Sequence, residues 1–170
     1  ATQQKHTECA KFLLNEAMPV EQRIKKHIAI GEVQTLRRLH LEKVWLDVEV
    51  VVDSDKKDAL GNTWHFSALA YAAEQKQLGV MSLLIEIGVE LYETRPFHYP
   101  AANCAAGIGF IAGLELLKQN GCDLNRGDSQ GVRPVHCAAT HGQLPTLRML
   151  HSSGCALDCV NTDRLDVAHF

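Results

Sequence analysis

The sequence has neither a long apolar run nor an excess of positive charge. No hydrophobic stretch approaches the roughly 20 apolar residues that span a bilayer, and the opening ATQQKHTECAK lacks the basic-then-apolar order of a signal peptide. Lysine and arginine number 17 against 20 aspartates and glutamates, and this net charge of −3 supplies no basic field for phosphates. We therefore expect no membrane insertion, no binding of nucleic acid, and an intracellular location in the cytoplasm or the nucleus.

Motifs for catalysis or metal binding are also scarce. The sequence contains no G-x-x-x-x-G-K-[ST] phosphate-binding loop and no H-E-x-x-H zinc-protease motif. The acidic run of Asp53, Asp55 and Asp58 has no glycine at the sharp turn that a calcium loop needs. The glycines at 107 and 109 fall where a turn between two helices is expected. We therefore expect a protein that is not an enzyme and that holds no cofactor or metal.

What the sequence does contain is an internal repeat of 33 residues. The repeat aligns residues 67–91, 100–124 and 133–157. Each segment carries a pair of alanines, then a leucine on a periodic apolar stretch, then a glycine. At equivalent positions these are Ala72, Ala105 and Ala138, then Leu84, Leu117 and Leu150, then Gly88, Gly121 and Gly154.

This pattern predicts two helices in every repeat. Small alanines let the first helix lie close to its neighbours, a break such as Thr140-His141-Gly142 turns the chain, and the second helix carries one apolar stripe. Pro145 is expected at the first position of that second helix and Gly154 at its left-handed end. A single unit cannot bury its own apolar face, so the units must stack, which predicts an all-α solenoid.

The best-formed repeat resembles the ankyrin repeat. It reads Asp128-Ser-Gln-Gly-Val-Arg-Pro-Val-His136-Cys-Ala-Ala, followed by Gly142-Gln-Leu and later by Gly154-Cys-Ala-Leu-Asp158. The ankyrin unit is a β-turn finger and two antiparallel helices with a T-P-L-H-x-A core, and residues 133–136 (RPVH) are close to T-P-L-H. Residues 67–70 and 100–103 are degenerate copies. The resemblance covers about residues 60–161 and implies an ankyrin-repeat solenoid of about four units with partial ends.

The repeat extends towards the N-terminus after an interruption. Residues 31–39 match residues 142–150 at an offset of 111, which is three repeats and 12 extra residues. The extra residues fall in 48–61, a segment that first alternates like a strand and then becomes charged, so we expect a lengthened finger loop. The expected organisation of the single domain is a cap helix (1–19), an irregular unit (20–47), the lengthened finger (48–61), ankyrin-like units (62–94, 95–127 and 128–160), and the start of a further unit or a cap (161–170).

The cysteines fit repeat positions better than a metal site or a disulfide framework. Cys104 and Cys137 are 33 residues apart in a first helix, and Cys122 and Cys155 are 33 apart after the glycine that ends a second helix. Packed helices lie about 8–10 Å apart, which is too far for a disulfide, so we expect reduced thiols. No Cys-x2-Cys pair brings zinc ligands together. His136, at the motif histidine, is expected to bond the backbone of a neighbouring loop.

The resemblance implies that partners bind to the finger tips and to exposed positions of the first helices, which together line a concave groove. Trp64 with Phe97, and Phe66 with Tyr99, occupy equivalent finger positions of two adjacent repeats. Either these rings shield the core by packing on one another and on the long loop, or they are exposed anchors for a partner. The predicted partner-binding residues are Trp64, Phe66, Glu74, Phe97, Tyr99, Ile108, Gln130, Val132 and His141.

Two functions fit this sequence. The first is a scaffold or recognition module that binds a protein or peptide partner. The second is a regulatory ankyrin domain of a larger enzyme or channel, whose partner is another domain of the same chain. A pathogen effector that mimics host ankyrins is a third, less supported alternative. The finger aromatics beside an acidic loop suit a partner that offers apolar anchors and some basic charge.

Overall fold

The computed structural model describes residues 18–42, 49–51, 65–92 and 99–158, which form eight α-helices and two short strands. The expected cap helix up to residue 17 and the expected last unit at 161–170 lie outside these residues. The elements in chain order are α2 (Val20–Ile30), α3 (Val33–Leu41), β1 (Glu49–Val51), β2 (His65–Ser67), α4 (Ala68–Glu74), α5 (Leu78–Glu86), α6 (Ala101–Gly107), α7 (Ile111–Gln119), α8 (Pro134–Thr140) and α9 (Leu144–Ser152).

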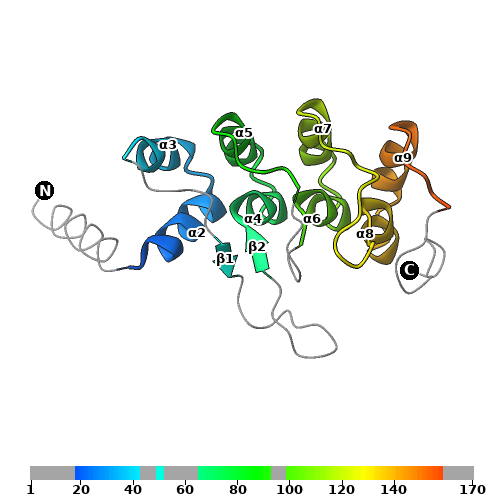
Figure 1. Cartoon of the computed structure of the whole chain (residues 1–170), viewed down its shortest axis with the longest axis horizontal. Coiled ribbons are helices and arrows are strands. Elements are labelled where there is room, and N and C mark those ends of the chain that lie inside the picture. Colours follow the sequence, from blue (N-terminus) through cyan, green and yellow to red (C-terminus); the bar gives the residue numbers. More distant parts are fainter. Residues whose placement is uncertain (1–17, 43–48, 52–64, 93–98, 159–170) are drawn as a thin grey trace, which may run out of the picture.

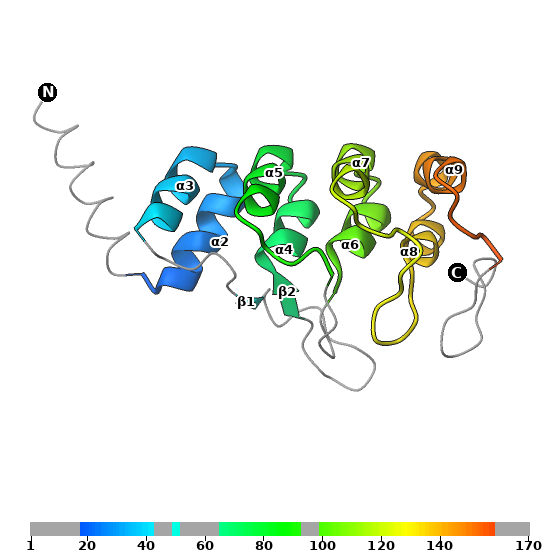
Figure 2. The same ribbon diagram turned by 45° about the horizontal axis from the view of Figure 1, so that its top comes forward.

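The helices form two layers (Figures 1 and 2). The inner layer holds α2, α4, α6 and α8 side by side, and the outer layer holds α3, α5, α7 and α9, each packed on the inner helix before it. Each unit contacts the next one mainly through its inner helix, from α2 to α4, α4 to α6 and α6 to α8. The described part of the chain is thus an all-α repeat solenoid, which confirms the predicted fold class.

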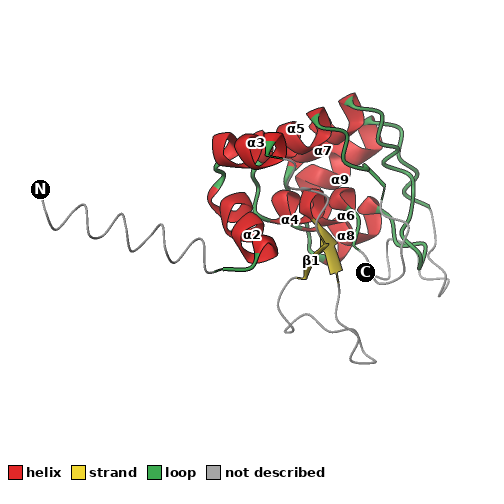
Figure 3. Cartoon of the chain, turned by 60° about the vertical axis from the view of Figure 1, so that its left-hand side comes forward, coloured by secondary structure: helices red, strands yellow, loops and turns green. Residues whose placement is uncertain are grey.

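The first two units are joined by an antiparallel hairpin. Glu49 pairs with Ser67, Val50 with Phe66, and residue 51 with residue 65. The strand β1 forms where the alternating residues predicted one, and the hairpin lies on the side of the inner layer away from the outer helices (Figure 3). Residues 52–64, which include the charged half of the expected finger loop, lie outside the described residues.

Small side chains allow the inner helices to approach one another closely. Ala72, Ala105 and Ala138 have no exposed surface, and residues of this slot contact the neighbouring inner helices. The outer helices bury their leucines as completely, since Leu84, Leu117 and Leu150 are also fully buried. In the first unit a histidine takes the alanine slot, and His27 Nδ1 lies 2.7 Å from a carboxylate oxygen of Glu32.

Left-handed residues turn the chain at both ends of the outer helices. Gly154, two residues after the end of α9, has φ of 86°, which is the left-handed conformation that the sequence predicts there. Pro145 is the second residue of α9 rather than the first, because Leu144 already belongs to the helix. The turn between inner and outer helix uses Gly142 at φ 63° in the fourth unit, whereas the second unit has Lys76 at φ 54° in the equivalent place.

Replacing Lys76 by glycine should therefore stabilise the protein. A side chain in the left-handed region is strained, while glycine adopts that region freely, and the two effects leave a net gain of about 0.5–1 kcal/mol. The measurement is the free energy of unfolding from urea titration. The matched control is Gly142→Ala, because a Cβ there would meet nothing within 4 Å and its cost reports backbone strain alone. A loss of stability in Lys76→Gly would mean that the lysine side chain stabilises this turn.

Truncation of Leu117 to alanine should destabilise the solenoid strongly. Leu117 is fully buried on α7, in the third unit, so its loss leaves a cavity that typically costs about 2–5 kcal/mol. Because each repeat is stabilised by its neighbours, the denaturant midpoint should fall for the whole cooperative transition. Lys118→Ala is the control, since this adjacent side chain is exposed, and an equal loss in both variants would contradict the assignment of α7's buried face.

Candidate functional site

The structure describes seven of the nine predicted partner-binding residues. Gln130 and His141 are exposed, and Glu74, Ile108 and Val132 are partly exposed. Trp64 and Phe97 lie outside the described residues, so their placement stays a prediction. The remaining two, Phe66 and Tyr99, are turned into the protein.

Phe66 and Tyr99 pack against each other instead of lining an open surface. Phe66 is 4% exposed, and its ring centroid lies 6.0 Å from that of Tyr99. Tyr99 Oη lies 3.0 Å from Cys137 Sγ, which forms a hydrogen bond between the finger of the third unit and the inner helix of the fourth. Burial raises the pKa of the Tyr99 hydroxyl well above its usual range. The expectation that Phe66 is an accessible anchor is therefore wrong, because its ring is used in packing between units.

One slot at the end of each inner helix is open to solvent and varies from unit to unit. It holds Ile30, Gln75, Ile108 and His141 in the four units. Gln75 and His141 are exposed, Ile30 is 56% exposed, and Ile108 is partly exposed. Three residues earlier on the last three inner helices stands the fully buried alanine slot. Packing therefore fixes the residue type in one slot and leaves it unconstrained in the other.

The side chain of His141 lies at the boundary between the third and fourth units. Its Nδ1 lies 2.9 Å from the carbonyl oxygen of Cys137, which holds the ring against its own helix. A Cβ on Gly107 would lie 3.4 Å from the same nitrogen, so the imidazole rests against the backbone of α6. A fixed and exposed imidazole at a boundary between units is suited to contact a partner.

The finger of the fourth unit is a rigid turn with an exposed tip. Asp128 Oδ1 accepts hydrogen bonds from the backbone N–H groups of Gln130 and Val132, each at 2.9 Å. Burial raises the pKa of this carboxyl group, although both backbone hydrogen bonds oppose the shift. Ser129 and Gln130 remain exposed at the tip. These hydrogen bonds thus fix the backbone of the finger on which the two exposed polar residues stand.

The finger of the fourth unit also contains a sequence that is typical of a catalytic serine. Gly127-Asp-Ser-Gln-Gly131 fits G-x-S-x-G, the pattern of a nucleophile elbow. An elbow requires a strand followed directly by a helix, and here the serine stands in the finger turn closed by the Gly131 N–H to Asp128 carbonyl bond of 3.0 Å. The structural context that the motif needs is therefore missing from this part of the described chain.

Four cysteines of the repeat units are buried, as their repeat positions predict. Cys104, Cys122, Cys137 and Cys155 are all buried, and none of the four forms a disulfide. Burial raises the pKa of the Cys137 thiol to about 12 and that of Cys122 to about 11, so both stay protonated and are weak nucleophiles at neutral pH. Within the described residues, no group of three or more histidine, cysteine or acidic side chains is arranged to hold a metal ion.

Asn103 carries an unusual polar contact between units. Its Nδ2 donates to the carbonyl oxygen of Val132 in the next finger at 2.9 Å, the kind of tie that was expected of His136. Its Oδ1 is buried without a hydrogen-bond partner. In the next unit His136 Nδ1 accepts from the N–H of Arg133 at 2.9 Å. The residue equivalent to Arg133 is Pro100, which has no N–H to donate, and this explains the unpaired oxygen.

Comparison with known families agrees with this architecture. A family model of ankyrin repeats in three copies matches residues 69–163, which is more than half of the chain. This chain belongs to the ankyrin repeat family. No curated protein matches the sequence. In the described residues no helix is both long and apolar enough to cross a membrane.

The ankyrin units are also tied together just after each outer helix. Asn125 donates to the Gly154 carbonyl oxygen at 3.4 Å and accepts from the Ala156 N–H at 3.0 Å. Tyr92, 33 residues earlier, makes the equivalent pair of contacts with one hydroxyl group. It donates to the Gly121 carbonyl oxygen at 3.0 Å and accepts the backbone N–H two residues further on. A phenol thus replaces an amide at this position of the repeat.

The unpaired oxygen of Asn103 predicts an energetic coupling with Pro100. Replacing Pro100 by alanine supplies a backbone N–H group at residue 100. The equivalent N–H in the next unit, that of Arg133, donates to His136. Satisfying a buried acceptor is worth about 1 kcal/mol or more, so Pro100→Ala should be more favourable with Asn103 present than in the Asn103→Ala background by about that amount. The four proteins of this double-mutant cycle are compared by urea unfolding. A coupling energy near zero would show that the new N–H does not reach Oδ1.

Proposed function

We propose that this ankyrin repeat protein is a non-enzymatic recognition module that binds a protein or peptide partner. The proposed contact area, called here the finger–helix surface, consists of the fingers and the solvent-exposed ends of the inner helices. Its residues are Trp64, Glu74, Phe97, Ile108, Gln130, Val132 and His141. Phe66 and Tyr99 support this surface from below instead of contacting the partner.

The observation that carries the proposal is the variation of the exposed helix-end slot. The buried slots repeat alanine and leucine from unit to unit, while the exposed slot holds an isoleucine, a glutamine, a second isoleucine and a histidine. This slot exposes 56% of Ile30 and part of Ile108, so apolar groups alternate there with the polar side chains of Gln75 and His141. Mixed apolar and polar groups on a rigid frame are suited to protein recognition.

The chemistry of the described residues supports this non-enzymatic role. The strongest candidate nucleophiles are the thiols of Cys122 and Cys137, and both are buried and have raised pKa values. Ser129 lies on a finger tip instead of a strand-to-helix elbow. The family is generally one of protein-interaction modules, which agrees with these observations.

The finger–helix surface predicts where a partner can be cross-linked. A photoreactive phenylalanine analogue placed at Gln130 or at His141 should give the same covalent adduct when the protein is irradiated in an intracellular extract. The analogue at Lys118 or Arg148, two exposed positions on the outer helices, is the matched control and should give none. Adducts formed only from the outer helices would move the binding surface to the opposite side of the solenoid.

With the partner in hand, Trp64→Ala and His141→Glu should each weaken binding more than tenfold. Truncation of an interface anchor typically costs about 2 kcal/mol or more, and neither change removes a fully buried group described here. Lys118→Glu should bind like the unmodified protein. Affinity is measured by calorimetry. The melting temperature of each variant should stay near that of the unmodified protein, which shows that weaker binding is not caused by unfolding.

A further inference from the structure

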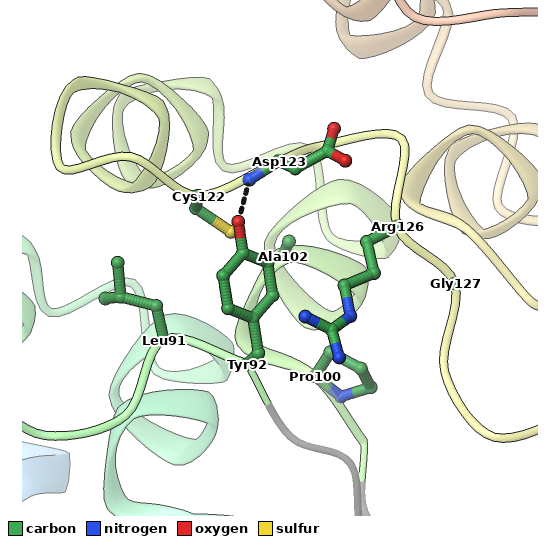
Figure 4. A pocket seen from close by; sticks show the side chains of 8 residues that line it. All are labelled: Leu91, Tyr92, Pro100, Ala102, Cys122, Asp123, Arg126 and Gly127. Carbon is green, nitrogen blue, oxygen red and sulfur yellow. Dashed lines mark hydrogen bonds between the residues drawn. The ribbon is translucent and has the colours of Figure 1, made fainter.

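A recess lies between the second and third ankyrin units, on the path from the outer helices to the fingers (Figure 4). Its apolar walls are Leu91, Pro100 and Ala102, and its polar lining includes Tyr92 and Arg126. Pro100 and Ala102 belong to the start of α6, whereas Ile108 of the finger–helix surface follows the other end of that helix. The recess therefore lies at the opposite end of α6 from Ile108.

The floor of the recess is fixed by hydrogen bonds. Tyr92 is held at its hydroxyl by the Gly121 carbonyl oxygen and by the N–H of Asp123. Its ring thus has a set orientation, and the same hydroxyl is drawn towards Asp123 in Figure 4. Because the Tyr92 ring is already held at its hydroxyl group, it loses little conformational freedom when a ligand binds beside it.

The guanidinium group of Arg126 lies over the ring of Tyr92. Its guanidinium carbon lies 4.6 Å from the centre of the Tyr92 ring, within the range of a cation–π contact. Its backbone N–H donates to the Asp123 carbonyl oxygen at 3.2 Å, which closes a turn and fixes the base of the side chain. Arg126 makes no ion pair with a carboxylate of the residues that the structure describes.

The nearby acid does not neutralise this arginine. Asp123 is occupied by its own turn, since its Oδ1 accepts the N–H of Asn125 at 2.9 Å. In Figure 4 its carboxylate points away from the guanidinium group. Arg126 is therefore an exposed cation whose hydrogen-bonding edge is available and whose flat face is already supported.

We propose that this recess binds a single carboxylate group joined to a small apolar side chain. The guanidinium of Arg126 would donate two parallel hydrogen bonds to the carboxylate oxygens, the geometry in which arginine binds carboxylates best. The apolar part of the ligand would contact Leu91, Pro100 and Ala102. A C-terminal residue of a peptide and an acidic side chain beside an apolar residue both supply this chemistry.

The charge balance favours a carboxylate over a phosphate. One guanidinium offers a single positive charge, and the carboxylate of Asp123 stands at the rim of the recess. A phosphate monoester carries between one and two negative charges at neutral pH, and its second charge would find no partner here. The net charge of −3 for the whole chain adds to this penalty.

The test is an NMR titration of the whole 15N-labelled chain with small probes. N-acetyl-leucine, which combines a terminal carboxylate with an apolar side chain, should bind with a saturable shift of signals from residues 91–92, 100–102 and 122–127. N-acetyl-leucinamide, which has the same side chain without the charge, should bind at least tenfold more weakly. The α-amide of N-acetylglutamate tests the side-chain source of the same group, and the stronger of the two acids identifies the source.

Variants and a competing anion complete the experiment. Arg126→Gln should lower the affinity for N-acetyl-leucine at least tenfold, and Arg126→Lys, which keeps the charge but loses the planar fork, should lower it severalfold. Lys118→Gln, on the exposed face of α7, is the matched control and should change nothing. The proposal is overturned if no acid binds, if the amide binds as well as the acid, if Arg126→Gln binds normally in a folded protein, or if inorganic phosphate at equal ionic strength binds more tightly than either acid.

Discussion

The close approach of the inner helices is the constraint on which the rest of the structure depends. It requires a slot with almost no side-chain volume, and Ala72, Ala105 and Ala138 fill that slot without any exposed surface. Once the inner helices are this close, the outer helices lie along the same axis and bury their leucines against them. Each repeat unit buries its apolar side chains mainly against the units beside it. Stability is therefore spread along the stack, and no single unit holds a core of its own.

Several polar groups at the boundaries between units form hydrogen bonds, and different residue types do so from one boundary to the next. An amide at Asn125 and a phenol at Tyr92 make equivalent contacts with the next unit. Gln77 donates from its side chain to the Ala29 carbonyl oxygen at 2.9 Å, across the first boundary between units. On the outer layer, both guanidinium nitrogens of Arg37 reach the carboxylate of Glu86, at 3.0 and 2.8 Å. This last pair is exposed, so water and salt screen it and its share of the stability is small.

The sequence predicted the solenoid because stacking imposes the same residue types every 33 positions. The sequence also predicted a strand near Val50, because apolar and polar residues alternate over this short segment. The orientation of the finger rings could not be predicted from the sequence, because Phe66 and Tyr99 are turned inwards by contacts with residues far along the chain. Tyr99 bonds Cys137, 38 residues away, and a repeat pattern carries no information on such a pair. The stack of Arg126 on Tyr92 was missed for the same reason, since neither of these repeat positions keeps one residue type from unit to unit.

Departures from the repeat therefore show where this chain differs physically from a regular ankyrin stack. Pro100 removes an N–H group and leaves the Asn103 oxygen unpaired, which is a local cost with no visible gain. Tyr92 is different, because the hydroxyl keeps the tie between units while the ring adds a flat surface that an asparagine lacks. That ring holds Arg126 in a fixed position beside the apolar start of α6. Tyrosine at this position thus keeps the contact between units and at the same time supports a cation on the surface of the solenoid, which is the arrangement on which the proposed carboxylate site depends.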